Sequence, residues 1–168
     1  MKARIISIAK QLVLMAAVVV IIGYWQTRDV PTGAAPKVTV QTLRGMSHDL
    51  PSAIQQKVTL IYFFAPWCGV CRLSMGNLNN LQKWFPDISV QAVALDYEST
   101  EEVQKFIDDI QVRIPISIGN QHVRDVWGIS AYPTYVLIGR DGLIHGASIG
   151  YSSQFGMILR VLWTKLIA

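Results

Sequence analysis

The chain has 168 residues, of which 51% are apolar, with a formal net charge of +4 and two cysteines. This length accommodates one ordinary domain and a short appendage. The excess positive charge lies before residue 38, because basic and acidic residues are equal in number after that point. No basic face is left to bind a phosphate backbone, so the composition excludes a nucleic-acid-binding protein.

The first 27 residues have the pattern of a membrane anchor. Residues 11–27 contain no charged side chain and end near two aromatic residues, Tyr24 and Trp25. A helix over this stretch would be roughly 25 Å long. The basic residues before it predict that the N-terminus stays in the cytoplasm; they are Lys2, Arg4 and Lys10.

A cleaved signal peptide is the alternative for this segment. Its cleavage site would need small residues soon after the apolar core, and the nearest small-residue cluster, at 33–35, comes too late and is followed by a proline. We therefore predict an uncleaved anchor at 1–27, a linker at 28–37 and a folded domain at 38–168. Both cysteines would then lie outside the cytoplasm.

Strands and helices alternate in the predicted domain. The segment 57–64 is almost wholly apolar, as expected for a strand that is buried on both faces. Residues 45–56 are predicted as a loop, and Gly76 as a bend within a helix. This order indicates an α/β fold with a central mixed sheet flanked by helices. The predicted strands are 38–43, 57–64, 88–95, 114–118, 134–138 and 143–147, and the predicted helices are 71–85, 99–110, 121–127 and 155–166.

Cys68 and Cys71 follow the apolar strand at a strand-to-helix junction. A structural disulfide that closes so short a loop would remove little entropy from the unfolded chain. A zinc site would need four ligands, and no second pair of cysteines is present. The spacing therefore indicates thiol–disulfide exchange.

Cys68 would reach the first turn of the following helix, where unpaired N–H groups favour a thiolate. We expect Cys68 to be the nucleophile and Cys71, one turn further in, to be the more buried, resolving thiol. Trp67 is either an apolar platform for a partner chain or a packing residue. Residues 69–70 carry no cation that would stabilise the thiolate, which argues against a strong oxidant and favours a reductase or a mid-potential exchanger. A reductase in an oxidising compartment would need a membrane electron donor.

Pro133 opens the predicted strand 134–138 and cannot donate a hydrogen bond to a neighbouring strand. Such a proline indicates an edge, a bulge or a cis peptide bond. If the bond is cis, the main chain of Tyr132 would be free to pair with an extended substrate peptide.

The segments 65–71 and 132–134, with the hairpin that follows, resemble the thioredoxin fold. The N-terminal anchor and the added strand resemble the TlpA/DsbE-like membrane-anchored thiol–disulfide oxidoreductases. Within that branch, residues 68–72 and 150–157 resemble the copper-sensitivity suppressor protein D (ScsD-like) group. The resemblance implies a redox disulfide Cys68–Cys71, a cis Pro133, no cofactor, and protein thiols and disulfides as substrates. It also implies a DsbD-like electron donor and a single-pass protein of the bacterial inner membrane with its catalytic domain in the periplasm.

Three positions depart from that pattern. Tyr62 stands where thioredoxin has a buried aspartate, Ser74 where many TlpA-like proteins have a glutamate, and Gly76 where they have a proline. No sequence-local carboxylate is left to take the proton from Cys71. Asp96, which follows a strand, either approaches Cys71 or is a turn or cap residue.

Two other functions stay open: a copper protein that binds Cu(I) through the two thiolates, and a redox-inert adaptor. We expect no further metal ligands, because the histidines are scattered over different predicted elements. A peroxidase is disfavoured, since Ala65 stands where that chemistry needs a threonine. The histidines are His48, His122 and His145.

Overall fold

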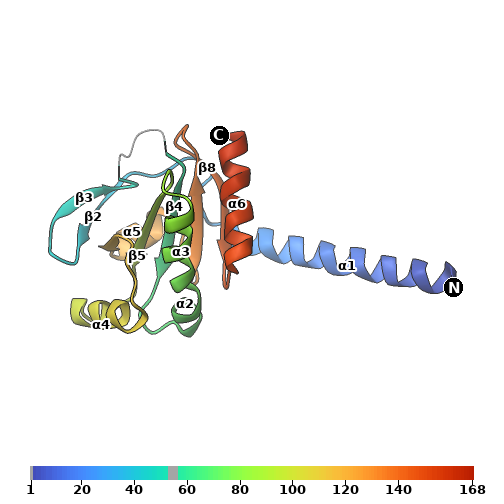
Figure 1. The fold of residues 1–168 in the computed structure, drawn as a ribbon, viewed down its shortest axis with the longest axis horizontal. Coiled ribbons are helices and arrows are strands. Elements are labelled where there is room, and N and C mark those ends of the chain that lie inside the picture. The colour runs from blue at the N-terminus through green and yellow to red at the C-terminus, as the bar shows by residue number, and fades with distance from the viewer. Residues whose placement is uncertain (1, 53–56) are drawn as a thin grey trace.

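The computed structural model describes residues 2–52 and 57–168 as a mixed β-sheet with helices on both faces and a long N-terminal helix (Figure 1). The strands are β1 Gly33–Ala34, β2 Val38–Thr42, β3 Ser47–Leu50, β4 Thr59–Phe64, β5 Ser89–Ala94, β6 Ile116–Ile118, β7 Thr134–Ile138 and β8 Leu143–Ile149. The helices are α1 Lys2–Thr27, α2 Gly69–Ser74, α3 Gly76–Trp84, α4 Thr100–Ile110, α5 Gln121–Val126 and α6 Gln154–Ile167.

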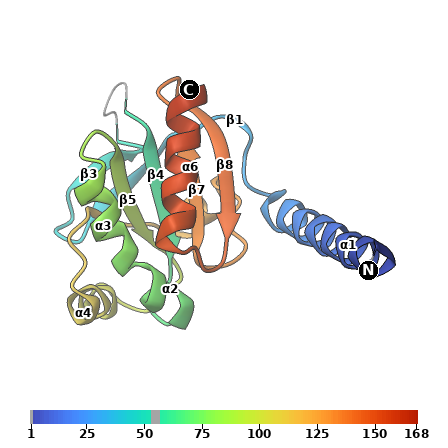
Figure 2. The same cartoon turned by 45° about the vertical axis from the view of Figure 1, so that its right-hand side comes forward.

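The sheet has the order β1-β8-β7-β4-β5-β6-β2-β3, which places β4 near its centre. β4 pairs with β5 in parallel and with β7 antiparallel (Figure 2). β5 also pairs with β6 in parallel. The predicted α/β fold with a mixed sheet is therefore confirmed. Because β4 and β5 run in parallel, the segments that follow them lie at the same edge of the sheet.

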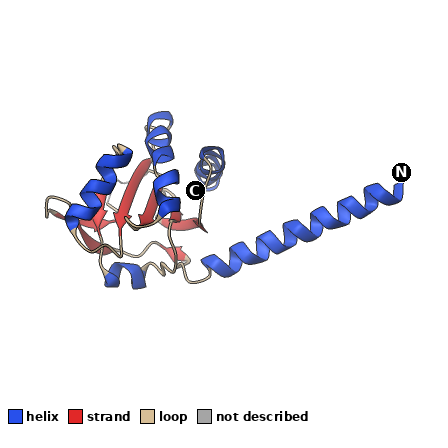
Figure 3. Ribbon diagram, turned by 90° about the horizontal axis from the view of Figure 1, so that it is seen from below, coloured by secondary structure: helices blue, strands red, loops and turns tan. Residues whose placement is uncertain are grey.

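Each face of β4 packs into a different hydrophobic cluster. Leu60, Tyr62 and Phe64 face α2, α3, α4 and α6, whereas Ile61 and Phe63 face α5. All six residues of β4 are buried, which explains the continuous apolar run in the sequence. Seen edge-on, the helices lie above and below the sheet (Figure 3).

The helix predicted over 71–85 consists of two helices, α2 and α3. Met75 separates them, and Gly76 is the first residue of α3, as expected from the bend predicted there. The first helix begins at Gly69, two residues earlier than predicted. The reason is that Cys68 itself caps the helix, so that both cysteines belong to its first turn.

Two strands lie in segments that were predicted to be irregular. β3 falls within the predicted loop 45–56 and pairs antiparallel with β2; residues 53–56 lie outside the described residues. β1 falls within the predicted linker 28–37 and pairs with β8, and Val30 nearby is only 4% exposed. The linker segment therefore packs against the domain over part of its length.

Helix α1 projects away from the sheet (Figure 1), and its described apolar side chains, such as Leu14 and Ile21, are exposed. In the described ranges, no helix combines the length and the apolar character that crossing a membrane requires. The transmembrane helix predicted from residues 11–27 thus has no support from the structure, although the helix itself is present.

Gly128, just after α5, lies in close contact with the main chain of the linker segment. Its φ is +60°, and a Cβ added there would lie 1.8 Å from the main-chain oxygen of Asp29. Gly142, in the hairpin between β7 and β8, has a φ of +76° and no heavy atom within 4 Å of an added Cβ. The two glycines share a left-handed backbone and differ in the space around them.

We expect Gly142→Ala to lower the free energy of unfolding by about 1 kcal/mol, the cost of a left-handed alanine. Gly128→Ala should cost about 3 kcal/mol or more, because the same backbone cost is joined by the collision with Asp29. Urea denaturation of both variants measures the difference. Equal losses would show that the segment around Asp29 does not pack against α5.

Candidate active site

Cys68 is the N-cap of α2 and forms a disulfide with Cys71. Its Sγ accepts a hydrogen bond from the main-chain N–H of Cys71 at 3.1 Å. In the described part of the chain, this is the only hydrogen bond to either sulfur. A sulfur at this position occupies the place of the side-chain oxygen that usually caps a helix, and an N–H donor directed at it stabilises a thiolate.

The two cysteines differ in exposure. Cys68 is 7% exposed and Cys71 is fully buried, as the sequence analysis expected. Of the two, Cys68 is thus the residue with any surface open to an incoming sulfur. Since both sulfurs lie in one helical turn, a Cys71 thiolate needs no large movement to attack Cys68.

Trp67 lies on the surface immediately before Cys68, with 65% of its area exposed. Its indole N–H donates to the main-chain oxygen of Asp96 at 2.8 Å. The Trp67 ring meets the Tyr132 ring edge-on, with 5.9 Å between centroids. The structure thus brings these two residues, predicted from distant parts of the sequence, into contact. The exposure of Trp67 favours a platform over a packing role.

The peptide bond between Tyr132 and Pro133 is cis, which confirms the expected geometry. The carbonyl of Pro133 accepts a hydrogen bond from the N–H of Gly150 at 2.8 Å. No hydrogen bond engages the main-chain N–H or carbonyl of Tyr132 among the described residues. Both groups of Tyr132 are free to pair with the backbone of an extended peptide.

Tyr62 and Ser74, which replace the two carboxylates of related proteins, form a hydrogen-bonded pair beneath Cys71. Their hydroxyl oxygens are 2.9 Å apart. The Ser74 hydroxyl also lies 2.9 Å from the carbonyl oxygen of Val70, and if it donates there the Tyr62 hydroxyl is the donor to Ser74. The Tyr62 hydroxyl also lies 3.4 Å from the carbonyl oxygen of Cys71. Burial raises the pKa of Tyr62 far above its usual value, so the pair is uncharged.

Tyr135 packs edge-on against Tyr62, with 4.9 Å between the ring centroids. Its hydroxyl is buried and has no hydrogen-bond partner among the described residues. Burial raises the pKa of Tyr135 as well. The space below the cysteines is therefore filled by two neutral phenols, and only Tyr62 makes a hydrogen bond of good geometry.

Asp96 does not approach Cys71. Its Oδ2 accepts hydrogen bonds from Nη1 of Arg124 at 2.9 Å and from the hydroxyl of Tyr132 at 3.0 Å. Its φ of +49° marks it as a turn residue, which was the second of the two interpretations offered for it. No carboxylate among the described residues contacts Cys71, so a local carboxylate base for this thiol is absent from that part of the chain.

Sequence reasoning missed Arg124. The signal was present, because α5 follows β6 and Asp96 follows β5, and these neighbouring strands are parallel. The segments after parallel neighbours meet at one edge of a sheet, where opposite charges can pair. The residues next to Arg124 in the sequence do not indicate that it pairs with Asp96, so the ion pair was not predicted.

The histidines do not form a metal site. His48 lies 3.0 Å from the hydroxyl of Ser117, His145 forms an ion pair with Asp141, and His122 is exposed. In residues 2–52 and 57–168 there is no group of three or more His, Cys, Asp or Glu side chains that could hold a metal ion. No third His, Cys, Asp or Glu side chain joins the two cysteines among the described residues, so the Cu(I) alternative gains no support.

Comparison with known proteins gives consistent results. The family model described as AhpC/TSA matches residues 31–147. The thioredoxin-like protein YneN of Bacillus subtilis is 31% identical over 69% of this chain and 69% of its own length. The thiol-disulfide oxidoreductase ResA of Bacillus thuringiensis is 28% identical over 71% of this chain and 70% of its own length. A thioredoxin family thiol:disulfide interchange protein from Chlorobium tepidum has the same fold, with a TM-score of 0.70 and 20% identity over 80% of this chain and 97% of that one.

We expect Tyr62→Phe to lower the free energy of unfolding of the oxidised protein by about 1–2 kcal/mol, because Ser74 loses a buried hydrogen-bond partner. Tyr135→Phe is the matched control: its buried hydroxyl lies near Ser74 and Tyr62 but makes no hydrogen bond of good geometry, so its loss should cost less than about 0.5 kcal/mol. Urea denaturation measures both. A similar cost for the two variants would contradict the hydrogen-bond assignment.

Proposed function

The chain belongs to the AhpC/TSA family, and we propose that it is a protein thiol–disulfide oxidoreductase of the ResA type in which Cys68 attacks and Cys71 resolves. The observation that carries this proposal is the position of Cys68 as the sulfur cap of α2, with Cys71 fully buried behind it. The Cys68 sulfur accepts a main-chain N–H and would be the one that an incoming disulfide meets. The Cys71 sulfur lies within one helical turn of it.

The reaction takes place in two exchange steps. The Cys68 thiolate attacks one sulfur of a substrate disulfide, forms a mixed disulfide and releases the other substrate sulfur as a thiolate. Cys71 then loses its proton and attacks Cys68 Sγ, which closes the Cys68–Cys71 disulfide and releases the second substrate sulfur. The substrate gains two electrons, the cysteine pair loses two, and the proton from Cys71 with one from solvent neutralises the substrate thiolates.

The proposed direction is reduction of the substrate. A strong oxidant owes its potential to a stabilised reduced form. Among the described residues, the only hydrogen bond to Cys68 Sγ comes from a neutral main-chain N–H, and the pair Tyr62–Ser74 behind Cys71 is also neutral. No cation in that part of the chain bonds to the sulfur, so the couple should be a reductant or a mid-potential exchanger. Its electrons would come from a DsbD-like donor in the membrane.

The proposed location is the periplasmic side of the bacterial inner membrane. Its support is the sequence alone: basic residues precede an uncharged apolar stretch at 11–27 and predict a cytoplasmic N-terminus. The assignment to the copper-sensitivity suppressor protein D group likewise remains a prediction from residues 68–72 and 150–157. Neither assignment is needed for the exchange chemistry.

Turnover of a peptide disulfide with dithiothreitol as the electron source tests the proposal. We expect the parental protein to be active, Cys68→Ala to be inactive, and Cys71→Ala to accumulate a mixed disulfide through Cys68. The last species is identified by its mass and is released by added thiol. Activity of Cys68→Ala at the parental rate, or adduct formation through Cys71 in that variant, would contradict the assigned roles.

A further inference from the structure

We propose that Asp96 is a positioning residue that holds Trp67 and Tyr132 as one wall of the peptide-binding site beside Cys68. The proposal rests on the proposed function, since it concerns how that site binds an extended polypeptide. Three hydrogen bonds from three separate segments meet at this one residue. Trp67 donates to its main-chain oxygen, and Tyr132 and Arg124 donate to its carboxylate.

The topology explains why Asp96 can reach both aromatic residues. Phe64, the last residue of β4, pairs with Ala94, the last residue of β5, so the two parallel strands end side by side. Trp67 lies in the segment that follows β4, and Asp96 lies in the segment that follows β5. Tyr132 arrives at the same edge from the segment before β7, which pairs with β4 antiparallel.

Trp67 needs such a contact because most of its side chain is in solvent. A ring that is 65% exposed is held by few packing atoms. Its indole N–H bond at 2.8 Å and its edge-on contact with Tyr132 are the interactions that fix its orientation. A fixed aromatic wall binds a peptide with a smaller loss of conformational freedom than a mobile one.

Tyr132 is held through its hydroxyl. The bond to Asp96 keeps the ring against Trp67, while its main-chain N–H and carbonyl stay unpaired among the described residues. Burial and the neighbouring negative charge of Asp96 both raise the pKa of Tyr132, so it remains a hydroxyl donor. Tyr132 would thus bind a substrate strand through its main-chain N–H and carbonyl, while Asp96 fixes its side chain.

Arg124 sets the orientation of the carboxylate. Its Nη1 donates to the same Oδ2 of Asp96 that Tyr132 uses, and its Nε donates to the carbonyl of Ile129 at 3.1 Å. The guanidinium is therefore anchored on two sides. The ion pair is partly exposed, with about a third of each side chain in solvent, so its role is orientation rather than stability.

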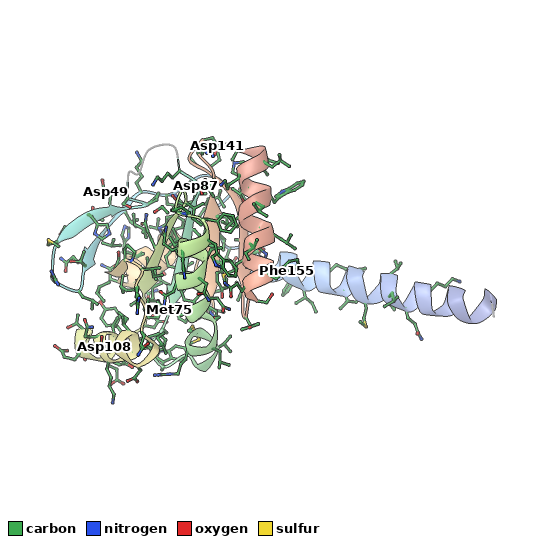
Figure 4. The ribbon with its side chains drawn as sticks, viewed as in Figure 1. Asp49, Met75, Asp87, Asp108, Asp141 and Phe155 are labelled. Carbon is green, nitrogen blue, oxygen red and sulfur yellow. A yellow bond between two sulfur atoms is a disulfide. The ribbon has the colours of Figure 1, made fainter. Side chains whose placement is uncertain are left out.

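Two variants test the proposal. Tyr132→Phe deletes the bond to Asp96 and keeps the ring, and Asp96→Asn keeps an oxygen and tolerates the left-handed backbone but loses the charge that orients Arg124. Asp87→Asn is the control: Asp87 also pairs with a basic side chain, Lys165, but lies at the opposite end of the sheet from α2 (Figure 4).

The substrate is a synthetic peptide with one disulfide flanked by apolar residues, and hydroxyethyl disulfide serves as a small substrate that cannot span the wall. We expect Tyr132→Phe and Asp96→Asn each to raise KM for the peptide about three- to tenfold, with kcat little changed. The rate with hydroxyethyl disulfide and the redox potential of the cysteine pair should match the parental values. The double variant should be no worse than the worse single variant, because both changes act on one contact. Asp87→Asn should behave as the parent.

Binding without chemistry separates this inference from the proposed function. The same peptide with serines in place of its cysteines should bind the oxidised protein, and its Kd should rise by the same factor in both variants. An inactive parental protein would defeat the proposed function and leave this measurement standing. Unchanged KM and Kd in both variants, or an equal loss of rate with peptide and small disulfide, would overturn the role of Asp96.

Discussion

The hydrogen bond from the Cys71 N–H to Cys68 Sγ is the contact on which the chemistry of this protein depends. It exists because the fully buried strand β4 ends at Phe64 and the chain then turns into helix α2 at Gly69, whose first N–H groups have no partner within the helix. The sulfur that caps this helix therefore has an N–H donor that would stabilise a thiolate, and its residue keeps a small exposed fraction that Cys71 lacks. Burial of Cys71 in the same turn then assigns different roles to two chemically identical side chains.

The surroundings of this contact are uncharged. Behind Cys71 lie two tyrosines and a serine, and the carboxylate of Asp96 is bound to Arg124 and Tyr132. The Asp96–Arg124 ion pair thus contacts Tyr132 and makes no hydrogen bond to either sulfur among the described residues. On the proposed function, the neutral interior would set the redox potential, and the polar support would shape the binding surface.

Local patterns in the sequence predicted most of the scaffold. The apolar run of β4, the spacing of Cys68 and Cys71, and the proline that opens β7 each act through neighbouring residues, so they can be read directly. β1 and β3 were missed because their partners lie elsewhere in the chain, and pairing with β8 and β2 decides their conformation. The Asp96–Arg124 pair was missed for the same reason, since only the parallel order of β5 and β6 brings it together. The apolar N-terminal stretch predicted a helix correctly, and its relation to a membrane still rests on sequence.

The redox potential of the Cys68–Cys71 couple tests the central claim most directly, because it measures how far the protein favours the thiolate over the disulfide. A sulfur stabilised by a neutral N–H alone should give a value between about −270 mV, as in thioredoxin, and about −180 mV, as in protein disulfide isomerase. Equilibration with glutathione buffers of known potential, read by mass after alkylation, gives the number. A value near −120 mV, as in DsbA, would show that a charge absent from this account stabilises the reduced form.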